Sequence, residues 1–218
     1  MRSREIENYK KTLKLTREQR DTLVGILLGD ACLETQNDGR TYRLKVEQSA
    51  DHQKYVEHLY KLFEPWVLSE PRQRERTASS GAKSSSWGFS TLSHGAFRFY
   101  ARQFYVERKK CVPKLIRRWL TPRGLAYWYM DDGSAKSGQS KGVIFNTQGF
   151  PAKDVDRLVG VLGDEFELDA KRRRQSEGWQ IYVSGRSFET FRDLVGPFII
   201  DSMRYKVPHP RRTQMPKE

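Results

Sequence analysis

The stretch Leu23-Val-Gly-Ile-Leu-Leu-Gly-Asp30 is apolar over a helical length and ends in an aspartate. The stretch Leu125-Ala-Tyr-Trp-Tyr-Met-Asp-Asp132 repeats this pattern in the second half of the chain. A helix-start signal precedes each of them: Thr16-Arg-Glu-Gln19 has the spacing of a capping box, and Thr121-Pro122 places proline at the first helical position. The sequence therefore predicts two helices that each end in acid.

The two helices differ in how closely another backbone can approach them. Gly25 and Gly29 lie one turn apart on the same face of the first helix, where no side chain holds a neighbour away. The second helix offers Ala126 before the bulky run Tyr127-Trp-Tyr129. We therefore expect the first helix to provide the close approach.

The acidic ends of these helices indicate a metal site. A carboxylate at a helix C-terminus is electrostatically unfavourable, because the helix dipole already places negative charge there. A divalent cation would remove this penalty, since carboxylates and last-turn carbonyl groups together form an oxygen-lined site. The alternative is an ordinary helix-ending turn at Asp132-Gly133 and a solvated Asp30. The same ending in two related stretches favours the metal site.

The segments that follow the two helices come in the same order in both halves. After each helix the sequence predicts a strand, a helix with apolar spacing of i, i+3, i+4 and i+7, a second strand, a further helix and a lysine before Val-Pro. The matching segments are Tyr42–Val46 with Val143–Phe145, Val56–Phe63 with Val155–Leu162, Trp87–Phe89 with Trp179–Val183, helix starts at Ser93 with Ser184 or Ser187, and Lys110–Pro113 with Lys206–Pro208.

This repeated order predicts an α+β fold with two pseudo-symmetric halves. Each half has the order α-β-β-α-β-β-α and forms an antiparallel sheet with helices packed on one face. The predicted boundaries are an N-terminal half at 1–111, a linker at 112–121, a C-terminal half at 122–208 and a basic tail at 209–218 without a packing pattern.

Composition narrows the class of partner. The 218 residues include 40 Lys and Arg against 27 Asp and Glu, so the net charge of +13 favours a polyanion, with nucleic acid ahead of an anionic membrane. No apolar stretch approaches the ~18 residues of a transmembrane helix, so we expect no membrane insertion. Cys32 and Cys111 are the only cysteines, which excludes a disulfide framework, and no paired Cys/His spacing indicates zinc. The N-terminus lacks the pattern of a secretion or transit signal, so we expect a soluble intracellular protein.

The chain resembles the monomeric, two-motif LAGLIDADG homing endonucleases encoded by mobile introns, in particular the mitochondrial omega-intron subgroup. Leu23–Ala31 and Leu125–Gly133 look like two degenerate copies of the motif that names the family. The resemblance covers residues 15–208. Its specific strings are Gly29-Asp-Ala31, Trp66-Val-Leu-Ser69, Leu125-Ala-Tyr-Trp128, Met130-Asp-Asp-Gly133, Asn146-Thr-Gln148 and Tyr205-Lys206.

The resemblance implies a specific metal site. In this family the two motif helices pack together at the centre of a pseudo-dimer, and the final acidic residue of each binds Mg²⁺. The matching residues here are Asp30 and Asp132, with two or more divalent ions for the pair of active sites. Asp131 falls one position earlier and is expected to be structural, although its carbonyl group and that of Gly29 could help to bind metal.

The resemblance also implies two catalytic lysines, Lys110 and Lys206, one in each half. Hydrolysis of a phosphodiester needs a water activated by metal and a cation near the charge that develops in the transition state. Lysine provides that charge on a flexible side chain. The alternative is that each lysine is one of the many basic surface residues of the chain. Its repeated place before Val-Pro favours the catalytic role.

Basic strands indicate how the protein would bind DNA. Arg72, Arg74 and Arg76 alternate, so in a strand they share one face at a spacing of about 6.6 Å, near the phosphate spacing along a DNA strand. The run Lys171–Arg174 occupies the matching place in the second half, and a solvated charged face is the alternative for both. We predict major-groove binding by two-stranded ribbons. The predicted DNA-binding residues are Arg40, Arg43, Lys45, Gln48, Arg72, Arg74, Arg76, Lys136, Lys141, Arg172, Arg173 and Arg174.

The resemblance thus implies a monomeric, site-specific DNA endonuclease of intron homing. Its partner would be a long site in double-stranded DNA, in which it would make, as in the family, a staggered, Mg²⁺-dependent double-strand cut with 3′ overhangs. One alternative is an RNA-splicing maturase that binds intron RNA, and another is a structural RNA-binding protein of ribosome type. The retained acids and lysines favour the nuclease. The family, rather than the sequence itself, indicates an organelle, either the mitochondrion or the chloroplast.

Overall fold

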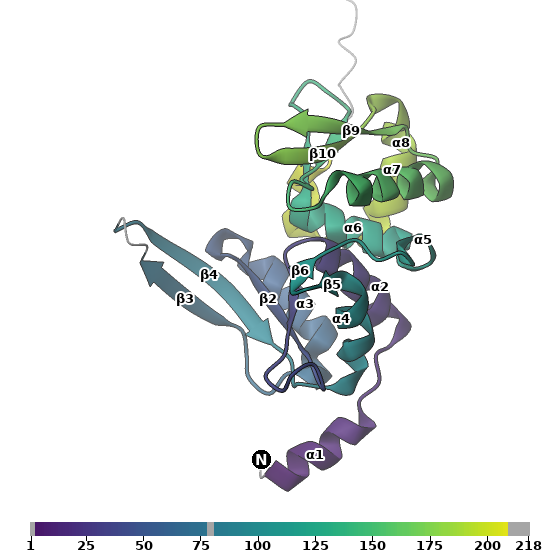
Figure 1. Cartoon of the computed structure of the whole chain (residues 1–218). Coiled ribbons are helices and arrows are strands. Elements are labelled where there is room, and N and C mark those ends of the chain that lie inside the picture. Colours follow the sequence, from purple (N-terminus) through teal and green to yellow (C-terminus); the bar gives the residue numbers. More distant parts are fainter. Residues whose placement is uncertain (1–2, 78–80, 209–218) are drawn as a thin grey trace, which may run out of the picture.

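Two four-stranded antiparallel sheets organise the computed structural model, which describes residues 3–77 and 81–208 (Figure 1). The predicted basic tail at 209–218 lies outside the described residues. The first sheet has the spatial order β1 (Cys32–Glu34), β2 (Arg43–Ser49), β4 (Lys83–Ser90), β3 (Arg72–Thr77). The second has the order β7 (Gly133–Ala135), β8 (Val143–Phe145), β10 (Gly178–Val183), β9 (Ala170–Gln175).

The helices confirm the repeated order predicted from the sequence. The chain runs α2-β1-β2-α3-β3-β4-α4 in the first half and α6-β7-β8-α7-β9-β10-α8 in the second, so the α+β prediction is correct. The boundaries proposed for the halves stay a prediction. The helices are α1 (Ser3–Thr12), α2 (Arg17–Leu28), α3 (Gln53–Phe63), α4 (Arg98–Phe104), α5 (Ile116–Trp119), α6 (Pro122–Asp132), α7 (Ala152–Phe166) and α8 (Phe188–Val195).

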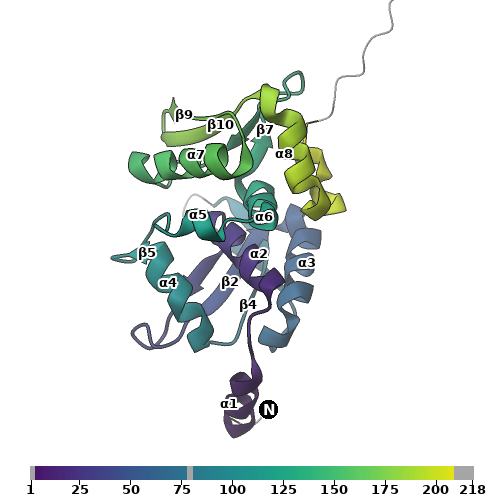
Figure 2. The same cartoon turned by 90° about the vertical axis from the view of Figure 1, so that its right-hand side faces the viewer.

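Several elements lie outside the repeat. Helix α1 sits at the end of the molecule that is farthest from the second sheet (Figures 1 and 2). A short hairpin of β5 (Tyr105–Val106) and β6 (Lys109–Lys110) precedes the expected linker, and α5 lies within that linker. The helix expected at Ser93 is preceded by a short 3-10 turn, η3 (Gly95–Phe97), whose cap is His94. The imidazole Nδ1 accepts a hydrogen bond from the amide of Ala96, so His94 caps this turn one residue after the predicted start at Ser93.

The starts of α2 and α6 are the ones predicted. The Thr16 hydroxyl accepts a hydrogen bond from the Gln19 amide at 3.1 Å, and the Gln19 side chain accepts one from the Thr16 amide at 3.0 Å. The hydroxyl of Thr121 accepts from the amide of Gly124 at 3.2 Å, ahead of a proline at the first helical position. Both caps satisfy amide groups that a helix leaves without internal partners.

Helices α2 and α6 pack against each other at the centre of the molecule, between the two sheets (Figures 1 and 2). A Cβ atom on Gly25 would overlap the carbonyl oxygen of Gly124, so the two backbones touch there. The bulky residues of α6 point elsewhere, with Tyr127 against His58 of α3 and Trp128 against Phe145 of β8. The close approach therefore uses one glycine from each helix, Gly25 and Gly124, and not the first helix alone.

Each sheet has one face covered by helices and one open face. Leu44 and Val46 of β2 are buried beneath α3, while Arg43, Lys45 and Glu47, which alternate with them, are only partly buried. Helix α7 lies across β9 and β10 in the same way (Figure 2). We call the helix-covered side of each sheet its inner face and the opposite side its outer face. No helix of the described residues is long and apolar enough to cross a membrane.

Candidate active site

The C-terminal ends of α2 and α6 bring three carboxylates together. The backbone amide of Asp30 donates to Oδ2 of Asp131 at 3.1 Å, which joins the two motif stretches directly. The side-chain amide of Gln48 donates to Asp30 Oδ2 at 2.9 Å and to Asp131 Oδ1 at 3.1 Å. Asp132 follows as the last residue of α6. Gln48 thus bridges an acid from each half of the chain.

The two motif ends are not symmetric at this point. Gly29 precedes Asp30 in the first stretch, where the second stretch has Asp131 before Asp132. A Cβ on Gly29 would overlap the Asp131 side chain. The absence of a side chain at Gly29 therefore makes room for the carboxylate of Asp131 between the helices.

The crowding of these acids changes their titration. Burial first, and the charge of Asp30 second, raise the pKa of Asp132 to about 7, although Lys110 and Lys206 oppose the shift. Burial, together with Asp30, raises the pKa of Asp131 well above its usual value. Both shifts favour the protonated, neutral form of these two carboxyl groups.

Lys110 and Lys206 occupy matching positions at the two helix ends. The Nζ of Lys110 donates to the carbonyl groups of Gly29 at 2.7 Å and Ala31 at 2.9 Å. The Nζ of Lys206 donates to the carbonyl groups of Met130 and Asp131, the latter at 3.0 Å. Each ammonium group therefore lies where the dipole of its motif helix is negative.

Burial lowers the pKa of both lysines, and the nearby acids oppose that shift. Lys110 lies at the end of the β5–β6 hairpin, and Lys206 ends the 3-10 segment η6 (Asp201–Lys206). Different local structures thus deliver the same group to the same place, as the repeated Lys before Val-Pro predicts.

The donor set fits Mg²⁺. The site offers carboxylate oxygens from two helix ends, which are the hard oxygen ligands that this ion prefers. No three His, Cys, Asp or Glu side chains within residues 3–77 and 81–208 form a ready-made metal cage. Mg²⁺ is usually held by one or two carboxylates plus waters and substrate phosphates, so an open pair of carboxylates suits it. The carbonyl groups of Gly29 and Asp131, expected as further ligands, already accept hydrogen bonds from the lysines.

The basic residues of the first half mostly share the outer face of the first sheet. Arg72, Arg74 and Arg76 follow one another along β3, which is exposed throughout. Arg43 and Lys45 lie on the same face of β2, since Leu44 between them is buried on the other face. Arg40 is exposed in the turn that precedes β2. Gln48 is the exception, because its place in β2 directs it to the inner face and the acidic site.

The basic run of the second half divides between the two faces. Arg172 is paired in register with Ile181 and Arg174 with Trp179, which places both arginines on the inner face. Arg172 forms a 2.6 Å ion pair with Asp156 of α7, and both guanidinium groups stack on Trp179.

The outer face of the second sheet keeps fewer of the predicted residues. Arg173 lies there, opposite Gln180. Lys136 and Lys171 both lie over the ring of Tyr182 on that face. The three consecutive arginines predicted to bind DNA therefore do not share one face, because successive residues of a strand point to opposite faces.

Lys141 lies apart from the other predicted DNA-binding residues. Its Nζ is 3.4 Å from Glu189 Oε1 and lies over the ring of Phe188, so it is held against the start of α8.

Comparison with known proteins identifies the family. A family model described as the LAGLIDADG DNA endonuclease family matches residues 20–191. The chain belongs to this family. That match contains both motif stretches, Leu23–Ala31 and Leu125–Gly133, together with Gln48 and Lys110.

Individual LAGLIDADG proteins are similar over nearly the whole chain. "Probable intron-encoded endonuclease 1" of Wickerhamomyces canadensis is 33% identical over 94% of this chain and 90% of its own length. The structure described as "The homing endonuclease I-WcaI bound to its DNA recognition sequence" superposes with a TM-score of 0.90 and 30% identity, covering 96% of this chain and 95% of that one. The "Cytochrome b mRNA maturase bI2" of Debaryomyces hansenii is 27% identical over 93% of this chain and 78% of its own.

Sequence reasoning missed two features of the LAGLIDADG site. Gln48 was assigned to the DNA surface with its strand neighbours, and its inner orientation could have been read from the alternation with buried Leu44 and Val46. Asp131 was expected to be structural, with a carbonyl group that could help to bind metal, but the contacts of its carboxylate with Asp30 and Gln48 were not foreseen. The doubled acid in the second motif was the available signal.

Proposed function

We propose that this protein is a site-specific DNA endonuclease of intron homing. The observation that carries this proposal is the pairing of one terminal acid and one lysine from each half around the ends of α2 and α6. Asp30 with Lys110 and Asp132 with Lys206 form two related sets, as two strand cuts within one chain require. The similarity to an intron-encoded endonuclease and to a homing endonuclease bound to DNA supports the proposal.

In the proposed mechanism Asp30 and Asp132 would hold Mg²⁺, which would supply the Lewis acidity that activates water for hydrolysis. Lys110 and Lys206 present their ammonium groups toward the charge that develops on the scissile phosphates. Gln48 fixes the orientation of Asp30 through its hydrogen bond, and the carboxylate of Asp131 fixes the backbone of Asp30.

The outer faces of both sheets would bind the DNA. Five cationic residues of the first sheet's outer face and three of the second's support this, and in the family such sheets form a saddle. Binding would use major-groove contacts on either side of the central acids, with a staggered cut and 3′ overhangs across the minor groove. The cations are Arg43, Lys45, Arg72, Arg74 and Arg76, then Lys136, Lys171 and Arg173.

We propose that the protein acts as a monomer. The contact between the two motif helices is made within one chain, and the glycine pair at its centre leaves no space for another helix. An organelle is the compartment that we propose, in agreement with the intron-encoded origin that the name of a relative states.

A second candidate is an RNA-splicing maturase. The similarity to a cytochrome b mRNA maturase supports it. Binding to intron RNA alone would not need a pair of terminal acids with matched lysines, so the nuclease explains more of the structure. The nucleic acid on which the protein acts distinguishes the two activities, because the nuclease acts on double-stranded DNA and the maturase on intron RNA.

Cleavage of a plasmid library with random or intron-junction sites, in Mg²⁺ and in EDTA, tests the proposal. We expect Asp30→Asn and Asp132→Asn each to abolish double-strand cleavage while DNA binding stays within a few fold of the parent. Asp193→Asn, which neutralises an exposed acid of α8, is the matched control and should cut normally. Full cutting by either site variant would refute the assignment of the acids.

A further inference from the structure

Glu47 lies in the middle of the otherwise basic outer face of the first sheet. Its two carboxylate oxygens meet three cations, with Oε1 at 2.8 Å from Arg76, and Oε2 at 3.3 Å from Lys45 and 3.6 Å from Arg74. The hydroxyl of Ser86 also donates to Oε1 at 3.0 Å. The Glu47 side chain is 18% exposed, whereas that of Arg76 is 62% exposed. The carboxylate of Glu47 therefore forms ion pairs with cations of both β2 and β3.

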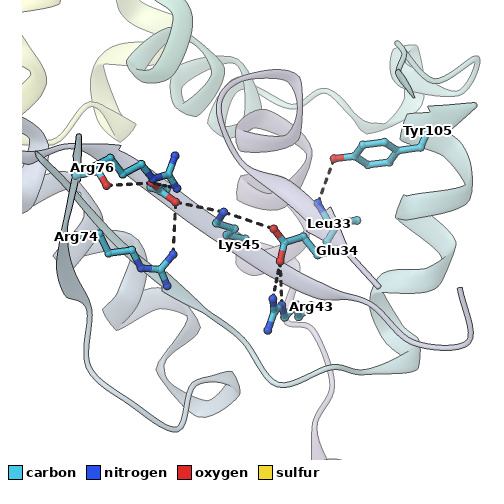
Figure 3. Close-up of polar contacts among 9 residues, drawn as sticks. Leu33, Glu34, Arg43, Lys45, Arg74, Arg76 and Tyr105 are labelled. Atoms are coloured by element: carbon cyan, nitrogen blue, oxygen red, sulfur yellow. Dashed lines mark hydrogen bonds and ion pairs between the residues drawn. The ribbon is translucent and has the colours of Figure 1, made fainter. Parts of the chain in front are cut away.

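Glu34 extends this arrangement toward β1. It accepts two hydrogen bonds from Arg43, at 2.7 and 3.1 Å, and lies 3.5 Å from Lys45. Carboxylates and cations thus alternate across the outer face, from Arg43 through Glu34, Lys45 and Glu47 to the arginines of β3 (Figure 3).

An acid in this position is unfavourable for binding a phosphate backbone, because it repels the phosphates that the surrounding cations attract. It is also ionised. Partial burial raises the pKa of Glu47, but the Ser86 hydroxyl and Lys45 outweigh that effect and leave it lowered. A surface that served only to hold phosphates would gain affinity from a neutral residue here.

The geometry gives the carboxylate a different use. A guanidinium group has five donors in a rigid plane, so a carboxylate on one edge fixes the direction of the remaining donors. Guanine presents two acceptors, O6 and N7, on its major-groove edge, and arginine binds them with two parallel hydrogen bonds. An arginine that is already held by an acid reads bases in a defined register and adapts poorly to other partners.

We propose that Glu47 is a specificity-determining positioning residue, which aims Arg74 and Arg76 at base edges of the cognate site and disfavours other DNA. This inference rests on the proposed DNA-binding function of the outer face. The proposal gives the arginines of β3 two different roles, phosphate contact and base recognition. Arg72 forms no ion pair within the residues that the structure describes and serves as a phosphate contact, whereas its two neighbours serve as readers.

The chain offers a matched control for this proposal. Glu75 lies on β3 between the two reader arginines, but the alternation of the strand directs it to the opposite face. Glu47→Gln and Glu75→Gln remove the same charge from β2 and β3, the two strands that flank β4. Only the first removes a carboxylate that contacts arginines.

The test is a binding selection with the full chain on a library of random double-stranded DNA, in EDTA to prevent cutting, followed by sequencing. We expect Glu47→Gln to bind random DNA more tightly than the parent and to lose about tenfold in base discrimination at a few adjacent positions. Arg76→Gln should lose discrimination at the same positions. Glu75→Gln should keep the base preferences of the parent.

The outcomes separate this inference from the proposed function. A parent protein that selects no sequence from the library would refute site-specific DNA binding itself. A parent that selects a site, with unchanged base preferences in Glu47→Gln, would overturn the role of Glu47 alone. Should Glu47→Gln fail to fold, Arg74→Gln and Arg76→Gln carry the test, and a uniform loss of affinity without loss of preference would overturn the proposal.

Discussion

The backbone amide of Asp30 donates a 3.1 Å hydrogen bond to the carboxylate of Asp131, so each motif helix ends against the other. The two residues are 101 positions apart and come from the two halves of the repeat. This bond runs in one direction only, because the residue that matches Asp131 in the first half is Gly29. The centre of the molecule is therefore asymmetric, and the two active sites that we propose are not equivalent.

The first prediction concerns the two lysines. A residue that stabilises a transition state changes the chemical step and not the binding of the ground state. We therefore expect Lys110→Met and Lys206→Met each to lower the single-turnover rate on saturated DNA with little change in Kd. Lys109→Met, which removes the exposed neighbour of Lys110 on β6, is the control and should leave the rate unchanged.

The asymmetry of the site gives the lysine variants a second readout. Each lysine belongs to one motif end, so a single substitution should slow one strand cut more than the other. Nicked plasmid should then accumulate before the linear form in a time course at saturating enzyme. If both variants produced linear plasmid like the parent at two salt concentrations, Lys110 and Lys206 would be ordinary surface charges.

Salt dependence tests the role of Arg72. If it contacts a phosphate, Arg72→Ala should lower affinity for all sequences alike and reduce the slope of log affinity against log salt by about 0.9. Arg98→Ala removes the same charge from α4, away from the sheet, and should leave the slope unchanged. Fluorescence anisotropy over a salt series measures both slopes. A loss confined to the cognate site would instead make Arg72 a reader of bases.

The packing of the motif helices depends on Gly25. A Cβ there would overlap the carbonyl oxygen of Gly124, so Gly25→Ala must push α2 and α6 apart, and we expect a loss of ~1–3 kcal/mol in the free energy of unfolding. Gly160→Ala is the control in α7, where no atom lies within 4 Å of the added methyl group. It should stabilise by ~0.5–1 kcal/mol through helix propensity. Urea titration distinguishes the two, and equal midpoints would contradict the close contact.

The titration of Asp132 predicts a pH-dependent stability. Burial first, and the charge of Asp30 second, raise its pKa from the usual 3.8 to about 7, so the folded state binds a proton that the unfolded state releases. The contribution of this proton to the free energy of unfolding is complete below pH 3.8, and it is lost as the pH rises through 7. In EDTA, Asp132→Asn should therefore lose less Tm than the parent between pH 5 and pH 8.

Metal addition gives the complementary measurement. A cation held by Asp132 would replace the missing proton, so Mg²⁺ should raise the Tm of the parent at pH 8 more than that of Asp132→Asn. Equal shifts in the two proteins would place the metal elsewhere.

Local patterns in the sequence were enough to predict the elements and their order. The capping box at Thr16 and the Thr121-Pro122 start both form as expected, because each depends on residues within one turn. The alternating residues of β2 and β3 and the apolar spacing of α3 and α7 also report on single elements. Because these local signals repeat in the same order in both halves, they were enough to predict the α+β architecture and to indicate the family.

The contacts of the site depended on packing between elements. Three contacts follow from how the elements are arranged around each sheet. Gln48 contacts Asp30 and Asp131, and Arg172 pairs with Asp156 of α7. Glu47 pairs with arginines of β3. Side-chain alternation in a strand assigns residues to two faces, but it does not say what lies opposite each face. The sequence by itself therefore determined the elements and the pair of terminal acids, whereas only the tertiary structure decided the partners of these side chains, because those partners lie far away along the chain.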